Sequence, residues 1–165
     1  MAPKKLDELI ADHKKVGDAP FLLAHDAPVL VGKGISGALS SQKAQSGATL
    51  ATEMGPYLES LTWMDRVFEI RAVDKGTKAI SVGRTADSDV VINDFSVSRK
   101  QCTFTQQGDA WLLADAGSTN GTVVAGKKYK APATVLLKGG EELIIGRLAF
   151  EFHTPHTLVH KLKAG

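Results

Sequence analysis

The 165-residue sequence has little of several features that mark particular protein classes. Cys102 is its only cysteine, which excludes an internal disulfide and a zinc site built from cysteines alone. The formal net charge is only +2, too small to indicate a protein that binds nucleic acid or a membrane surface. Neither a membrane-span-length apolar run nor a signal-peptide core is present, so we expect a soluble, cytoplasmic protein.

Histidine is also absent from the middle of the chain. None occurs between His25 and His153, so the middle of the chain lacks the residue that most often acts as a general base. His153, His156 and His160 lie close together in the sequence, but no cysteine or carboxylate cluster beside them completes a metal site. We therefore predict no enzymatic activity, no metal and no cofactor.

Residues 1–31 predict an N-terminal extension made of a helix and short strands. Apolar residues between Leu6 and Val16 recur at helical spacing, and Gly17 follows them as a helix end. The apolar runs 21–24 and 28–31 are each only four residues long, which favours two short strands.

Residues 32–65 are rich in glycine, alanine and serine and predict a flexible linker with a lead-in to the next domain. Gly32 to Gly37 match the G-x-G-x-x-G pattern of dinucleotide-binding turns. The residues after this pattern lack the apolar face of the helix that such a turn requires. We therefore favour a glycine-rich turn, with nucleotide binding through Gly32–Gly37 as a weaker alternative.

From Arg66 onward the sequence changes to short runs in which apolar and polar residues alternate. The clearest runs are 68–72, 80–82, 102–105 and 143–152. Glycine-containing turns separate them, and this combination is typical of a two-sheet all-β sandwich, here over 66–153. Cys102 alternates with polar residues and is predicted to be buried packing. Residues 154–165 are predicted to form a polar tail.

Four polar segments interrupt the predicted strands. Gly83-Arg84 closes one strand, and residues 94–101 precede the next. Gly117 to Thr122, with the sequence Gly-Ser-Thr-Asn-Gly-Thr, separate two apolar runs, and the turn 137–141 leads toward Gly146. Their guanidinium, hydroxyl, carboxamide and backbone N–H groups are hydrogen-bond donors suited to a phosphate or a peptide backbone.

In order and spacing, these segments resemble the forkhead-associated (FHA) domain over about Arg66 to His153. The resemblance implies a β-sandwich of about eleven strands whose loops at one end bind phosphothreonine peptides. It also implies the ligands: Arg84, Ser98, Arg99 and Thr119 for the phosphate, and Asn120 for the peptide main chain. The residues that it implies to shape these loops are Gly83, Gln101, Asp115, Gly117 and Gly121. Gln101 stands where the family usually has a histidine.

The sequence thus predicts an adaptor that recognises phosphothreonine in substrates of a Ser/Thr kinase. A phosphate-independent interaction or assembly domain is the alternative, because Gln101 replaces the family's histidine and the N-terminal extension is long. Thr49 and Thr52 in the linker are candidate internal ligands once phosphorylated. Lys127, Lys128 and Lys130 form a basic run, which we interpret first as a solvated face and second as an aid in steering acidic peptides.

Overall fold

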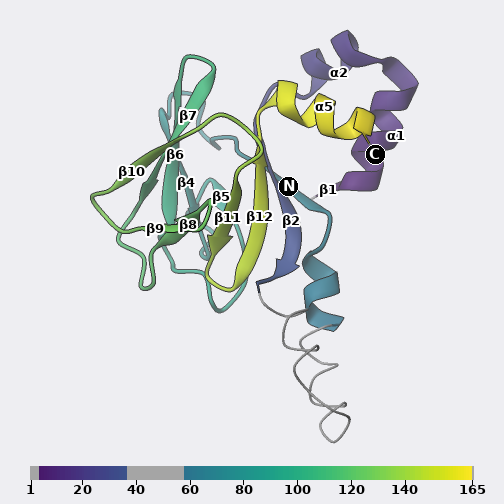
Figure 1. Cartoon of the computed structure of the whole chain (residues 1–165). Helices are drawn as coiled ribbons and strands as arrows, with labels where there is room; N and C mark the ends of the chain where they lie inside the picture. Colours follow the sequence, from purple (N-terminus) through teal and green to yellow (C-terminus); the bar gives the residue numbers. More distant parts are fainter. Residues whose placement is uncertain (1–3, 37–57, 165) are drawn as a thin grey trace, which may run out of the picture.

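Two sheets, antiparallel except for one strand pair, pack face to face in the computed structural model, which describes residues 4–36 and 58–164 (Figure 1). The seven-stranded sheet has the order β1 (Lys4–Lys5), β3 (Arg66–Glu69), β2 (Val29–Ile35), β12 (Leu148–His153), β11 (Glu142–Ile145), β8 (Thr122–Val124) and β9 (Lys127–Tyr129). The five-stranded sheet has the order β10 (Thr134–Leu137), β7 (Ala110–Asp115), β6 (Cys102–Gln107), β4 (Ala79–Gly83) and β5 (Val90–Val91), with β4 and β5 parallel. The predicted all-β sandwich is confirmed.

The core lies between the two sheets and follows the alternation of the sequence. Phe104 of β6 stacks on Phe152 of β12 with ring centroids 5.7 Å apart, so the two sheets meet through aromatic side chains. Cys102 is buried on the same face of β6 as Phe104. Burial, together with the nearby Asp115 carboxylate, raises the pKa of the Cys102 thiol, so this cysteine is a packing residue.

The N-terminal segment is more helical than its sequence predicts. Helix α1 (Leu6–Val16) ends at Gly17, whose φ of +85° suits glycine. Helix α2 (Asp18–Ala24) follows, so the strand predicted over 21–24 is wrong. Phe21 is fully buried whereas Leu23 is 85% exposed, because only one side of this short helix faces the protein. Pro20 lies in its first turn, where a missing N–H breaks no helical hydrogen bond.

Strand β2 crosses the predicted boundary between the extension and the linker. It lies between β3 and β12, in the middle of the larger sheet, so the N-terminal segment is built into the sandwich. A Cβ on Gly32 would lie 2.0 Å from the Trp63 carbonyl oxygen, and one on Gly34 would lie 2.4 Å from Ser60 Oγ. The glycines therefore let the helical residues 58–63 pack on the strand. Gly32 and Gly34 are not in a strand-to-helix turn, which contradicts the nucleotide-binding alternative; residue 37 lies outside the described residues.

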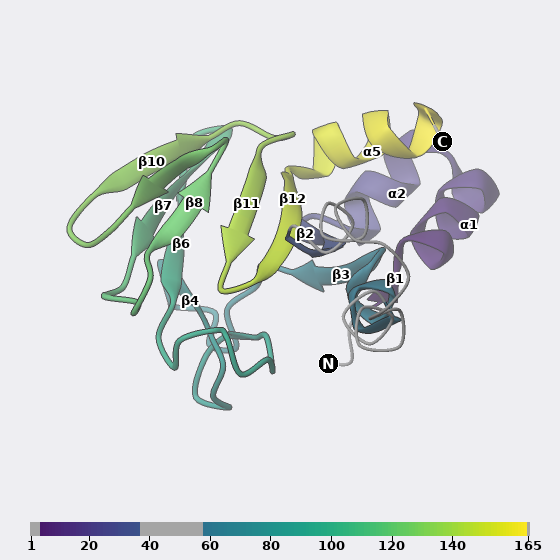
Figure 2. The ribbon, with the colours of Figure 1, turned by 60° about the horizontal axis from the view of Figure 1, so that its bottom comes forward.

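The segment predicted as a polar tail is mostly helix α5 (Pro155–Ala164). Figure 2 shows α5 beside α1 and α2, on the side of β2 and β12 that faces away from the smaller sheet. Its buried residues, Leu158, Val159 and Leu162, pack in a second core with residues of α1, α2, β2 and β3. Strand β2 is consequently covered on both faces, which explains its continuous apolar start. No helix of the described residues is long and apolar enough to cross a bilayer.

Candidate functional site

Three loops meet at one end of the sandwich, after strands β4, β5 and β7. The backbone N–H of Arg84 donates to the carbonyl of Ser98 over 3.1 Å, which joins the end of β4 to the loop before β6. The N–H of Ala116 donates to the Gln101 carbonyl over 3.0 Å, which joins that loop to residues 116–121. Segments far apart in the sequence are thereby fixed side by side.

Gly83 makes the first of these approaches possible. A Cβ at this position would lie 2.0 Å from the carbonyl oxygen of Arg99 and 2.7 Å from Ser88 Oγ. Any larger residue would push the 98–99 segment away from β4 and from Arg84. The loop-shaping role predicted for Gly83 thus has a direct steric basis.

The Gln101 side chain braces two of the loops against each other. It is 1% exposed, and its Oε1 accepts a hydrogen bond from the Ser98 N–H at 3.1 Å. Its Nε2 donates to the Gly121 carbonyl at 3.1 Å and to Thr122 Oγ1 at 3.0 Å. An amide therefore links the loop that carries Ser98 to the loop that carries Thr119, at the position where the resemblance places a histidine.

Asp115 holds the base of the 116–121 loop. Its carboxylate accepts hydrogen bonds from the backbone N–H groups of Gly117, Ser118 and Ala131 and from the hydroxyls of Ser118 and Thr122. Burial by itself raises the pKa of Asp115, but the hydrogen bonds from Ser118, Thr122 and the backbone outweigh burial and hold the pKa below its usual value. The carboxylate is therefore charged at neutral pH and fixes how the loop leaves β7.

The predicted ligands lie on the exposed side of these braces. Ser98 Oγ accepts a hydrogen bond from the backbone N–H of Thr119 over 3.1 Å. The half-buried Arg84 donates through Nη1 to the Phe95 carbonyl over 3.3 Å. Arg99, Thr119 and Asn120 are exposed. All five residues thus lie on three adjoining loops, while their contacts with a ligand stay predictions.

A second set of contacts, which sequence reasoning missed, holds the 94–96 loop from behind. Arg147, in the turn between β11 and β12, bonds the buried Asp94 carboxylate at 2.8 Å and 3.2 Å. Its guanidinium lies 4.3 Å from the Phe95 ring centroid and also pairs with Glu59. The turn at Gly146 was noted in the sequence, but its neighbour Arg147 gave no signal, since its partners are distant in the chain.

The histidines near the C-terminus do not converge. His153 is buried, where its Nδ1 lies 3.1 Å from Thr157 Oγ1 and its Nε2 contacts Glu151. His156 and His160 are exposed on α5. Within residues 4–36 and 58–164, no group of three or more histidine, cysteine or acidic residues is placed to hold a metal ion.

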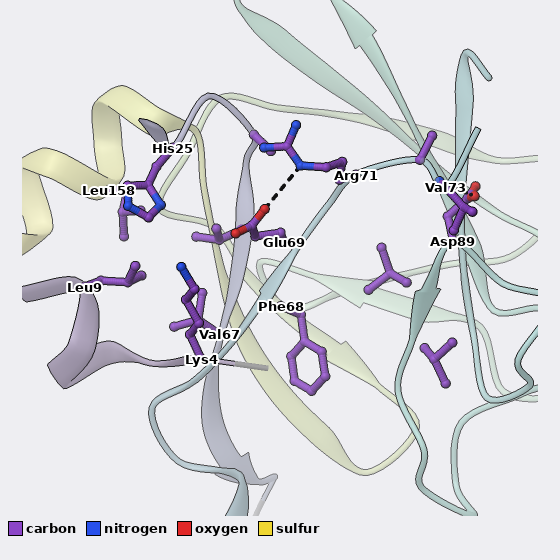
Figure 3. Close-up of a pocket in the computed structure, with 15 residues that line it drawn as sticks. Lys4, Leu9, His25, Val67, Phe68, Glu69, Arg71, Val73, Asp89 and Leu158 are labelled. Atoms are coloured by element: carbon purple, nitrogen blue, oxygen red, sulfur yellow. Dashed lines mark hydrogen bonds and ion pairs between the residues drawn. The ribbon is translucent and has the colours of Figure 1, made fainter. Parts of the chain in front are cut away.

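A pocket of about 410 Å³ lies elsewhere, along β3 and beside the helical layer (Figure 3). Its walls are mainly apolar and include Leu9, Val67, Phe68 and Leu158. Its arginine, Arg71, bonds Glu69 over 3.2 Å, the contact drawn as a dashed line. None of the predicted ligand or loop-shaping residues lines this pocket, so it is separate from the site at the loops.

The similarity of this chain to known proteins includes the region of the three loops. The family model described as FHA domain matches residues 80–146. The glycogen accumulation regulator GarA of Mycolicibacterium smegmatis is 29% identical over 150 residues, which cover 90% of this chain and 85% of GarA. The oxoglutarate dehydrogenase inhibitor of Corynebacterium jeikeium is 29% identical over 108 residues, which cover 66% of this chain and 65% of the inhibitor.

Solved structures agree on the fold. An FHA domain solved in an analysis of phosphothreonine-dependent FHA interactions superposes with a TM-score of 0.50 at 20% identity, over 78% of this chain and 96% of that one. An FHA domain of an Arabidopsis thaliana hypothetical protein gives a TM-score of 0.51 at 16% identity, over 78% of this chain and 86% of that one. At these identities the likeness concerns the architecture alone.

Proposed function

Since this chain contains an FHA domain, matched at residues 80–146, we propose that it is an adaptor that binds phosphothreonine peptides produced by a Ser/Thr kinase. The contact between Ser98 Oγ and the Thr119 N–H carries the proposal, because it joins two predicted phosphate-binding loops. As an acceptor in that bond, the Ser98 hydroxyl keeps its proton available for a phosphate oxygen. Arg84 donates a hydrogen bond to the Phe95 carbonyl, in the loop that carries Ser98, and its guanidinium supplies the positive charge for the phosphate.

The chemistry of phosphothreonine suits such a site. Its phosphate carries close to two negative charges and three acceptor oxygens, which a guanidinium and hydroxyls can hold without metal or catalysis. A hydrogen bond to a charged group is worth ~1.5–3 kcal/mol net. Two or three of them supply most of the ~8 kcal/mol of a micromolar complex. We assign the hydrogen bond to the peptide main chain to Asn120, whose exposure at the loop tip supports this role.

Matched peptides test the proposal directly. A phosphothreonine peptide chosen from an array is compared by titration calorimetry with its phosphoserine and unphosphorylated forms. We expect the phosphothreonine form to bind best and the phosphoserine form to bind ~1–3 kcal/mol more weakly, because it lacks one methyl group. The unphosphorylated form should show no binding. Equal binding of phosphorylated and unphosphorylated peptides would instead favour a phosphate-independent interaction domain.

We also propose an internal ligand, Thr49 or Thr52; both lie outside the described residues. Contacts of the residues on either side of the segment that contains these threonines support this proposal. The Ser36 N–H donates to the Arg147 carbonyl over 2.7 Å, and Glu59 pairs with the Arg147 side chain. Arg147 in turn holds Asp94, in the loop that leads to Ser98. Both ends of the intervening segment are therefore tied near the proposed site, and a short tether gives a high effective concentration.

Kinase treatment checks the internal ligand. After incubation with Ser/Thr kinases, mass spectrometry should detect phosphate on Thr49 or Thr52, and the modified chain should lose affinity for an external phosphothreonine peptide. The Thr49→Ala/Thr52→Ala chain, treated in the same way, should keep that affinity. Modification of neither threonine, or undiminished peptide binding after modification, would contradict the proposal.

A further inference from the structure

Lys128 lies on β9, in the hairpin of β8 and β9 (Figure 1), and Lys130 directly follows that strand. Lys128 pairs with Val123, and its neighbour Tyr129 turns toward the core. Because side chains alternate along a strand, Lys128 and Lys130 fall on one face and Tyr129 on the other. Both lysines are exposed.

The stems of both lysines lie against Gly121. A Cβ built on Gly121 would lie 3.0 Å from Cγ of Lys128 and 3.0 Å from Cγ of Lys130. The Lys130 Nζ lies 3.5 Å from the carbonyl oxygen of Thr119. Apolar stems held against backbone with charged ends in water are a common arrangement for lysine. Here the arrangement brings the Lys130 ammonium group and the stem of Lys128 to the rim of the proposed site.

The charge of this pair is not neutralised within the described part of the chain. Neither lysine is in ion-pair contact there with a carboxylate. Of the acids on the adjoining loops, Asp115 is buried and hydrogen-bonded to its own loop, and Asp94 is buried and paired with Arg147. The rim beside Thr119 is therefore positively charged. It would attract an acidic peptide but not a neutral one.

We propose that Lys128 and Lys130 make the site selective for phosphothreonine peptides that carry an aspartate or glutamate close to the phosphothreonine. The inference rests on the proposed function, since the phosphate places the peptide and Asn120 holds its main chain. An extended peptide advances about 3.3 Å per residue, so acidic side chains within one to three residues of the phosphothreonine come within reach of the lysines. The exposed ammonium groups select such peptides by charge.

A double-mutant cycle tests the selectivity. Peptides with alanine around phosphothreonine are compared with peptides that carry a single aspartate at each flanking position, on either side. Binding is measured by fluorescence anisotropy for the unaltered protein, for Lys128→Gln/Lys130→Gln, and for the control Lys14→Gln/Lys15→Gln on α1. We expect the best-placed aspartate to tighten binding roughly two- to fivefold. The gain should vanish in the first variant, persist in the control, and shrink as salt rises.

The outcomes separate the two proposals. If the alanine-flanked phosphothreonine peptide binds and its unphosphorylated form does not, the proposed function holds, whatever the effect of aspartate. The selectivity is overturned if aspartate gives no gain at any position, or if Lys128→Gln/Lys130→Gln weakens alanine- and aspartate-flanked peptides by the same factor. In the latter case the lysines act on the phosphate itself. Melting temperatures should match across the three proteins, since the replaced side chains are exposed.

Discussion

Replacing Arg84 or Ser98 with alanine is expected to cost ~1.5–3 kcal/mol of phosphopeptide binding, roughly a ten- to hundredfold rise in Kd, because each change removes a donor to a charged group. The sandwich should stay folded. Arg84 donates through its side chain only to the Phe95 carbonyl, and Ser98 Oγ accepts only the Thr119 N–H, among the contacts of the described residues. Titration calorimetry gives the affinity, and circular dichroism follows the fold.

Arg71→Ala is the matched control for Arg84→Ala. Arg71 follows β3 at the end where Glu69 pairs with Val29, whereas the proposed site lies toward the Ile35 end of β2. Its replacement removes surface contacts with Asp26 and Glu69 and should leave peptide affinity unchanged. An unchanged Kd in Arg84→Ala or Ser98→Ala would reject the role assigned to that residue.

Asp115→Ala is expected to lower the free energy of unfolding by about 3 kcal/mol or more, and to abolish peptide binding with it. Without the carboxylate, the buried hydroxyl of Ser118 loses its acceptor, and each buried group left unsatisfied costs about 1–3 kcal/mol. The N–H groups of Gly117 and Ala131 lose their acceptor as well. Urea denaturation measures the change, and Asp109→Ala, at an exposed turn, should shift stability by no more than about 0.5 kcal/mol.

The contribution of Asp115 should also depend on pH in a defined direction. Its pKa is lower in the folded protein than in the unfolded chain, so the folded state favours the ionised form. The stabilisation is therefore complete above the unfolded pKa of about 3.9 and is lost as pH falls through the lower folded value. The stability gap between the unaltered protein and Asp115→Ala should narrow below about pH 4. A gap that stayed constant into acid would show that the charge of the carboxylate is not its cause.

The sandwich could be predicted because its signal is local. In 102–105, alternate residues face the core, and the sequence alone reveals such a period. Strand β2 could not be predicted in the same way. Val29 to Val31 are buried on both faces and show no alternation, and Gly32 and Gly34 look like linker until residues 58–63 are placed against them.

For the candidate site, too, features carried by nearby residues could be predicted, whereas contacts between distant segments could not. The resemblance to the FHA domain, carried by the polar segments, implied five ligand residues, and these lie on three adjoining loops. The resemblance implied that Gln101 shapes the loops, but its partners at Gly121 and Thr122 could not be derived, because they are set by the approach of a distant loop. A carboxamide carries an acceptor and donors on one planar group, so glutamine can meet both loops at once. The substitution that motivated the phosphate-independent alternative therefore does not leave the loops unbraced.

The central place of β2 also governs the order in which this chain can fold during synthesis. Its register joins Val29 to His153, so this strand must wait for a partner that is translated much later. Until β12 arrives, the apolar run at the start of β2 has one open edge, and such edges attract other chains. Pairing between distant segments is also slow. A nascent or truncated chain that stops short of residue 148 leaves this edge of β2 unpaired, and we expect it to aggregate more readily than the chain that includes β12.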